Sequence, residues 1–252
     1  MRICVTNDDG WSAVGLRTLV LALSAEHEVL VVAPSSERSG SGTALGSLED
    51  GHTIATVPVD VLGATNAWSV DGPPAMCALI AMSGALGPLP DAVISGINAG
   101  HNTSRGIAHS GTFGAAFTAA RFGIPAFAIS AGAGPDARFD TAADIAVQLS
   151  CKLDLLPRFT VLNVNVPDAD ADDLGDPVES SLAARGMQNV GLQHDGAAIT
   201  LTERGPVGSP GDTQSVLDGR VTLTAVSAGL TTTDVPPALL AALSTQRPQE
   251  DL

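Results

Sequence analysis

Short apolar runs alternate with amphipathic stretches along the first two thirds of the chain. Gly, Pro or polar residues bound the runs, as expected of buried strands, and the stretches between them place apolar residues at helical spacing. The predicted strands cover residues 2–6, 29–33, 91–98, 126–130 and 161–167, and the predicted helices cover residues 15–25, 75–86, 113–122 and 141–156. This alternation predicts an α/β fold of the Rossmann-like type, with three αβα layers around a mainly parallel sheet.

The pattern changes after Pro167. Acids, Gly and Pro are frequent in residues 168–220, where short β-like pieces are separated by turns. We interpret this range as a smaller, β-hairpin-rich C-terminal appendage to a catalytic core of residues 1–167. Because the appendage has too little apolar sequence for a core of its own, we expect it to pack against another subunit, in a homodimer or a homotetramer. Residues 221–252 predict a returning strand, over Val221 to Val226, and a terminal helix over residues 236–244.

Composition and charge exclude several classes of function. The net charge is -15, and the 12 Lys and Arg residues form no cluster that could hold a phosphate backbone or an anionic membrane. The only lysine is Lys152, so the chain has no phosphate-binding loop of the GxxxxGK[ST] type. No apolar run reaches the roughly 20 residues that span a bilayer, and no basic leader precedes the first strand. We expect a cytoplasmic protein that acts on a small molecule.

The three cysteines, Cys4, Cys77 and Cys151, are widely spaced along the chain. This spacing matches neither a disulfide framework nor a CxxC metal site. Each lies among apolar residues, so we expect three buried, reduced thiols.

Two adjacent carboxylates, Asp8 and Asp9, end the first apolar run. In a parallel sheet, ligands bind beyond the carboxyl ends of the strands, which is where these residues would lie. Paired carboxylate oxygens suit a hard divalent cation such as Mg²⁺ or Mn²⁺. The alternative is a plain turn, since every residue of Asn7 to Gly10 favours turns.

Two further polar loops follow predicted strands. The Gly- and Ser-rich loop of residues 35–43 comes after the second strand and would lie beside Asp8, where it serves either as a linker or as part of a site. Ser110, Gly111 and Thr112 precede the Ala-rich helix. Backbone N–H groups and hydroxyls at a helix start can bind an anion, although a Ser or Thr there is more commonly a helix N-cap.

Taken together, these segments resemble the SurE family of metal-dependent nucleoside-monophosphate phosphatases, which are 5'/3'-nucleotidases. The likeness is carried by five ordered blocks, at residues 5–15, 33–40, 94–102, 110–126 and 162–167. The resemblance implies that Asp8, Asp9, Ser39 and Asn98 hold the metal, all through oxygen, as Mg²⁺, Mn²⁺ or Ca²⁺ prefers. It also implies that the phosphate group is bound by Asn98, Asn102, Ser110, Gly111 and Thr112.

This resemblance implies hydrolysis of nucleoside 5'-monophosphates, and possibly 3'-monophosphates, to nucleoside and phosphate. The cation would polarise the phosphoryl group and lower the pKa of an attacking water, and Asp8 or Asp9 would act as base or nucleophile. His109 is either a proton donor to the leaving oxygen or a solvent-exposed loop histidine.

Four segments depart from the family pattern, at residues 72–76, 103–105, 118–119 and 224–226. They leave open a non-catalytic or altered-specificity paralogue that binds a phosphorylated small molecule. Two other classes of protein fit this sequence less well. A phosphorylated receiver domain needs a third aspartate at the end of a central strand and a lysine on a late strand, and here Lys152 falls within a helix. A serine hydrolase needs GxSxG, and residues 128–132 lack the first glycine.

Overall fold

The computed structural model describes residues 1–132, 137–186, 190–205 and 207–230. The α-helices are α1 (Val14–Leu23), α2 (Pro74–Ser83), α3 (Gly111–Arg121), α4 (Phe139–Ser150) and α5 (Asp212–Leu217), and the short 3₁₀ helices are η1 (Arg105–His109), η2 (Leu153–Leu155) and η3 (Ala171–Asp173). The strands are β1 (Arg2–Thr6), β2 (Glu28–Pro34), β3 (Thr56–Pro58), β4 (Asn66–Val70), β5 (Ala92–Ala99), β6 (Ala126–Ala131), β7 (Thr160–Asn165), β8 (Gly175–Glu179), β9 (Val190–His194), β10 (Ile199–Glu203) and β11 (Arg220–Ser227).

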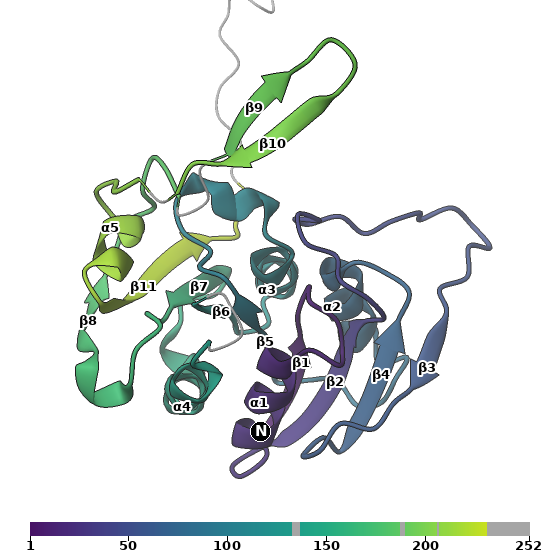
Figure 1. Ribbon diagram of the computed structural model, residues 1–252. Helices are drawn as coiled ribbons and strands as arrows, with labels where there is room; N and C mark the ends of the chain where they lie inside the picture. The colour runs from purple at the N-terminus through teal and green to yellow at the C-terminus, as the bar shows by residue number, and fades with distance from the viewer. Residues whose placement is uncertain (133–136, 187–189, 206, 231–252) are drawn as a thin grey trace, which may run out of the picture.

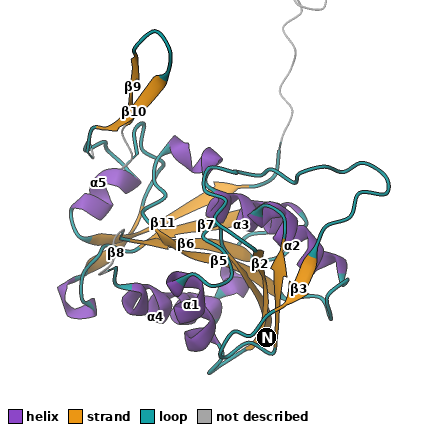
Figure 2. Ribbon diagram, turned by 45° about the vertical axis from the view of Figure 1, so that its right-hand side comes forward, coloured by secondary structure: helices purple, strands orange, loops and turns teal. Residues whose placement is uncertain are grey.

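Within the described residues, nine strands form one mixed sheet in the order β3-β4-β2-β1-β5-β6-β7-β11-β8. The central pairs from β4 to β7 are parallel, whereas β3 and β11 pair antiparallel with β4 and β7. Helices α1 and α4 cover one face of this sheet, and α2 and α3 cover the other (Figure 2). The structure therefore confirms the predicted three-layer fold with a mainly parallel sheet.

Strand β1 illustrates why short apolar runs in the sequence predict the central strands of the sheet. Ile3, Cys4 and Val5 are all fully buried, because helices cover both faces of a parallel sheet. Ile3 and Val5 belong to the apolar cluster beneath α1 and α4, and Cys4 belongs to the cluster beneath α2 and α3. The sheet therefore holds the end of β1, and the two aspartates that follow it, in a fixed place.

Two helices are shorter than the sequence predicts. Helix α2 ends at Ser83, because Gly84 takes the left-handed conformation (φ 77°) that terminates helices. Helix α4 ends at Ser150, and residues 153–155 form the separate turn η2. The predicted terminal helix over residues 236–244 lies outside the described residues. The prediction of three buried thiols was wrong for Cys151, which is exposed, and right for Cys4 and Cys77.

The predicted appendage contributes to both sheets. Strand β8 lies at the edge of the main sheet, in parallel with β11, while β9 and β10 form a two-stranded antiparallel hairpin. The hairpin projects from the body of the molecule (Figure 1). Among the described residues, no helix has the length and apolar character required to cross a membrane.

Candidate metal and phosphate site

The carboxyl ends of β1 and β5 and the amino end of α3 meet around one cavity of about 570 Å³. The loop that follows β2 closes another side of it. Six of the eight predicted site residues line the cavity, namely Asp8, Asp9, Ser39, Asn98, Asn102 and Ser110. The other two, Gly111 and Thr112, lie behind Asp8 at the start of α3. The parallel sheet thus brings together segments that are about 100 residues apart in the sequence.

The carboxylate of Asp8 is fixed by the first turn of α3. The Gly111 N–H donates to Asp8 Oδ2 at 3.1 Å, and the Thr112 hydroxyl donates to Asp8 Oδ1 at 2.5 Å. Asp8 is only 4% exposed, and the positive end of the helix dipole favours its negative charge. A Cβ added at Gly111 would lie 2.8 Å from both Cβ and Oδ2 of Asp8, so this close approach requires glycine.

Thr112 also links Asp8 to Asn98. Its Oγ1 lies 3.1 Å from Asn98 Oδ1, and the Asn98 amide Nδ2 donates to the carbonyl of Gly100 at 2.6 Å. This second bond orients the amide so that its oxygen faces Thr112 and Asp8. Because Thr112 is fully buried behind the carboxylate, its hydroxyl orients the predicted metal ligands and does not line the cavity.

Asp9 completes a pair of adjacent carboxylates. The pKa of Asp9 is raised to about 6, chiefly by burial and then by the charges of Asp8 and Glu37, while a hydrogen bond to the Ala99 backbone opposes the shift. Among the described residues the ion pairs are Arg2–Glu28, Arg38–Asp71 and Arg138–Asp170, and neither Asp8 nor Asp9 takes part. At neutral pH, above the raised pKa of Asp9, this carboxylate is therefore charged, and no described basic side chain forms an ion pair with it.

The donors around this charge suit a hard divalent cation. They are two carboxylates, an amide oxygen and a hydroxyl, all oxygen atoms. In the part of the chain that the structure describes, no group of three or more His, Cys, Asp and Glu side chains could hold a metal ion, so the amide and hydroxyl oxygens are a necessary part of this donor set. The residues that are present therefore fit Mg²⁺ or Mn²⁺.

The loop that carries Ser39 is anchored to the site through its backbone. The Arg38 N–H donates to the carbonyl of Asp8 at 2.7 Å, and the Gly42 N–H donates to the carbonyl of His109 at 3.1 Å. Ser39 itself is exposed, and its hydroxyl donates to Glu37 Oε1 at 3.0 Å. The loop is thus part of the cavity wall and not a linker, with the Ser39 oxygen at its surface.

Ser110 has the N-cap geometry that the sequence allowed. Its Oγ accepts from the Phe113 N–H at 3.1 Å, which satisfies one free donor at the start of α3. The same side chain lines the cavity, and its hydroxyl proton is not needed for the cap. Capping and phosphate binding are therefore compatible at this residue.

Asn102 is held by residues to which sequence reasoning gave no role. The buried side chains of Asn163 and Asn165 both donate to its backbone carbonyl, at 2.8 and 2.9 Å. The Asn102 amide donates to Ser130 Oγ at 2.9 Å. The sequence feature that indicates this role is the alternation of polar residues in β7, since asparagine is uncommon in a strand that is buried on both faces.

The two histidines near the cavity differ in their surroundings. His101 Nε2 lies 2.8 Å from the carbonyl of Val166, and burial lowers the pKa of this imidazole. His109 is exposed and lines the cavity, a position compatible with a proton donor and with an exposed loop histidine.

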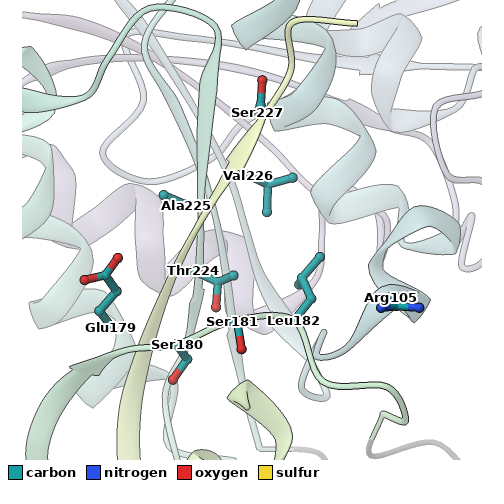
Figure 3. Close-up of a pocket in the computed structure, with 9 residues that line it drawn as sticks. All are labelled: Arg105, Glu179, Ser180, Ser181, Leu182, Thr224, Ala225, Val226 and Ser227. Atoms are coloured by element: carbon teal, nitrogen blue, oxygen red, sulfur yellow. The ribbon is translucent and has the colours of Figure 1, made fainter. Parts of the chain in front are cut away.

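A second cavity, of about 690 Å³, lies between β11 and residues 179–182 (Figure 3). It is lined by Arg105 and by residues 224–227, and it shares no lining residue with the cavity at Asp8. Arg105 and residues 224–226, which belong to two of the departures from the family pattern, therefore do not line the candidate site. A third, Thr118, donates to the Gly114 carbonyl within α3 at 2.8 Å, well inside that helix.

Known proteins resemble this chain over most of its length. The family described as "Survival protein SurE" matches residues 3–188. The chain is 40% identical over 215 residues to the 5'-nucleotidase SurE of Legionella pneumophila (strain Corby), covering 83% of this chain and 78% of the relative. It is 37% identical over 241 residues to the 5'-nucleotidase SurE of Halorhodospira halophila, covering 92% and 93%.

A solved structure supports the same assignment. The crystal structure of the SurE protein from Aquifex aeolicus superposes with a TM-score of 0.79 at 27% sequence identity, and it covers 97% of this chain and 99% of that one. The likeness therefore includes the appendage as well as the core.

Proposed function

Since this chain belongs to the SurE family, we propose that the cavity at Asp8 is the site at which it hydrolyses nucleoside monophosphates to nucleoside and phosphate. The observation that carries the proposal is the pair of carboxylates, Asp8 and Asp9, which have no ion-pair partner among the described residues and lie in one cavity with the start of α3. The chain is a phosphomonoesterase of the 5'-nucleotidase type, as its relatives are named.

Asp8, Asp9, Ser39 and Asn98 would hold the cation through oxygen. When bound, Mg²⁺ or Mn²⁺ neutralises phosphoryl charge and lowers the pKa of water at the site. The protein supplies orientation. Gly111 and Thr112 fix the Asp8 carboxylate before substrate arrives, so that little reorganisation is left for the reaction step.

The phosphate group is proposed to bind between Asn102 and Ser110. The Ser110 hydroxyl has a proton free to donate to a phosphoryl oxygen, and the positive end of α3 favours the anion. Asn102 lines the same wall and is fixed through its carbonyl by Asn163 and Asn165. Phosphoryl transfer depends mainly on positioning and charge neutralisation, and these residues provide both.

A panel of 5'- and 3'-nucleoside monophosphates tests the proposal. Each is incubated with the wild-type protein and Mg²⁺ or Mn²⁺, and released inorganic phosphate is measured. Release from at least one nucleotide supports hydrolysis. Nucleotide binding without release, with either metal, would support the non-catalytic paralogue instead.

We expect a divalent cation to raise the thermal unfolding midpoint more at about pH 7.5 than at about pH 5, because a proton competes with the metal for Asp9 below its raised pKa of about 6. The sign follows from the raised value. Above this pKa, Asp9 is ionised, its buried charge destabilises the folded protein, and a bound cation offsets that cost. Below this pKa, Asp9 is protonated, so there is less destabilisation for the cation to offset. Melts with and without Mn²⁺ at both pH values measure the effect. An equal shift at both would contradict the assignment of Asp9 as a ligand.

The β9–β10 hairpin favours a homo-oligomer. Leu192 and Leu201 are paired across it, on the face that also carries Val190 and Ile199, and these two leucines are 68% and 69% exposed. An apolar face on a projecting hairpin is costly in water unless a partner covers it. We propose a second copy of this chain as that partner, in a homodimer or homotetramer. We also propose that the protein acts in the cytoplasm, because its cysteines are free thiols and not disulfides.

Wild-type protein at micromolar concentration should therefore sediment as a dimer or a larger oligomer. The double substitution Leu192→Ser with Leu201→Ser should shift it toward the monomer, because it removes the paired apolar side chains. Gln193→Ser with Thr200→Ser is the matched control, since these residues pair on the opposite face of the hairpin. A monomeric wild type, or equal dissociation by both doubles, would contradict the proposal.

A further inference from the structure

The segment that leads into Ser110 has an unusual backbone. It passes through Ser104, which has φ 65° although it is not a glycine, and then forms η1 before reaching Ser110. A left-handed conformation is unfavourable for serine and persists only where the surroundings fix it. Gly106 and His109 of η1 line the catalytic cavity, so the position of this segment shapes the cavity directly.

What fixes Ser104 is the carboxylate of Asp212, more than 100 residues away in the sequence. The Ser104 N–H lies 3.0 Å from Asp212 Oδ1 and 2.9 Å from Oδ2. The same carboxylate accepts from the N–H groups of Ala183 and Thr213, at 2.9 and 2.8 Å. Asp212 is fully buried, and none of the ion pairs between described residues includes it.

Neighbouring contacts join the same segments. Thr213 Oγ1 lies 2.9 Å from Thr103 Oγ1 and 2.8 Å from the carbonyl of Arg185, and the Arg105 N–H donates to the carbonyl of Ala183 at 3.2 Å. These hydrogen bonds connect the 103–105 loop to the two segments around residues 183 and 212. Burial of a carboxylate without a cation is costly, and three N–H donors partly offset that cost.

We infer that Asp212 is a positioning residue for the phosphate side of the active site, acting through Ser104 and η1 on Ser110. This inference rests on the proposed function. A carboxylate is needed because it offers only acceptors to three N–H groups that converge on it. In Asp212→Asn, an amide oxygen in the place of Oδ1 still accepts from all three N–H groups, but the amide nitrogen in the place of Oδ2 faces the Ser104 N–H. The loop then loses its fixed position while Asp8 and Asp9 stay on the end of β1.

The test compares Asp212→Asn with Asp218→Asn, the same chemical change at the exposed end of the same helix. Asp212→Asn should weaken inorganic phosphate binding in the presence of Mn²⁺ by about ten- to a hundredfold, while Mn²⁺ affinity changes less. Amide hydrogen exchange over residues 103–110 should become faster in Asp212→Asn and stay unchanged in Asp218→Asn. Melts identify a temperature at which both variants are folded.

A double-mutant cycle separates positioning from general stabilisation. If Asp212 acts through the loop, Ser110→Ala should cost less phosphate affinity in the Asp212→Asn background than alone, because the hydroxyl is already misplaced. Gly186→Ala supplies a second variant, since its Cβ would lie 2.8 Å from Ser104 Oγ and 3.1 Å from the carbonyl oxygen of Thr103, so that the loop must shift. Like Asp212→Asn, this variant should lower the affinity for inorganic phosphate.

Additive effects in the cycle, or unchanged exchange over residues 103–110, would overturn the inference. Failure of the proposed function looks different. The wild type would then release no phosphate from any nucleotide, and hydrogen exchange in the two aspartate variants would still show whether Asp212 fixes the loop.

Discussion

Asp8→Asn is expected to leave a folded protein with phosphatase activity lowered on the order of a thousandfold, because loss of the bound cation removes several kcal/mol of transition-state stabilisation. The asparagine can keep a hydrogen bond to the start of α3, so the fold should persist. Asp9→Asn should have a similar effect through the neighbouring ligand. Metal affinity and hydrolysis of a generic aryl phosphate, measured on the same samples, test this expectation.

The matched control is Asp60→Asn, an exposed carboxylate remote from the cavity, which should leave both quantities unchanged. If Asp8→Asn and Asp9→Asn retain wild-type metal affinity and turnover, the metal is held elsewhere. The carboxylate pair would then be only the turn that its sequence also permits.

Thr112→Val is expected to weaken metal binding as well as catalysis. Its hydroxyl contacts Asp8 Oδ1 and Asn98 Oδ1, so valine removes a hydrogen bond to a charged group, at a cost of about 1.5 to 3 kcal/mol, and frees both ligands to reorient. Metal affinity and kcat/KM should therefore fall together, each by roughly ten- to a hundredfold.

Thr118→Val is the control for this change in the same helix, because among the described residues the Thr118 hydroxyl bonds only to the carbonyl one turn earlier in α3. It should alter neither quantity. The opposite outcome is a Thr112→Val protein with a raised KM and unchanged metal affinity. That result would assign Thr112 to phosphate and not to the support of Asp8.

The fold, and the meeting of the candidate site residues at one edge of the sheet, could be predicted because both depend on local patterns. A buried apolar run such as β1 is recognisable from its own residues, and the rule for parallel sheets places Asp8 and Asp9 at the ligand-binding edge. Thr112 illustrates where prediction stops. The Ser110 cap sets the rotation of the first turn of α3, and that rotation points Thr112 at Asp8.

The support of the site was harder to predict, because it depends on contacts between distant segments. Asp212 reaches Ser104 across more than 100 residues, and Asn163 reaches Asn102 across 61. In the sequence, nothing distinguishes Asp212 from the other acidic residues of this acidic chain. Its complete burial, which the structure shows, does. Likewise, the turns around β8 indicated an appendage, whereas the pairing of β8 with β11 puts this strand in the main sheet.

Cation dependence is tested most directly by phosphate release from adenosine 5'-monophosphate. Wild-type protein is stripped of metal by a chelator and then supplied with Mn²⁺ or Mg²⁺. We predict no release from the stripped protein, recovery on addition of either cation, and no recovery in Asp8→Asn. Full activity in the stripped protein, or equal recovery in Asp8→Asn, would contradict the claim that a divalent cation held at Asp8 and Asp9 drives the reaction.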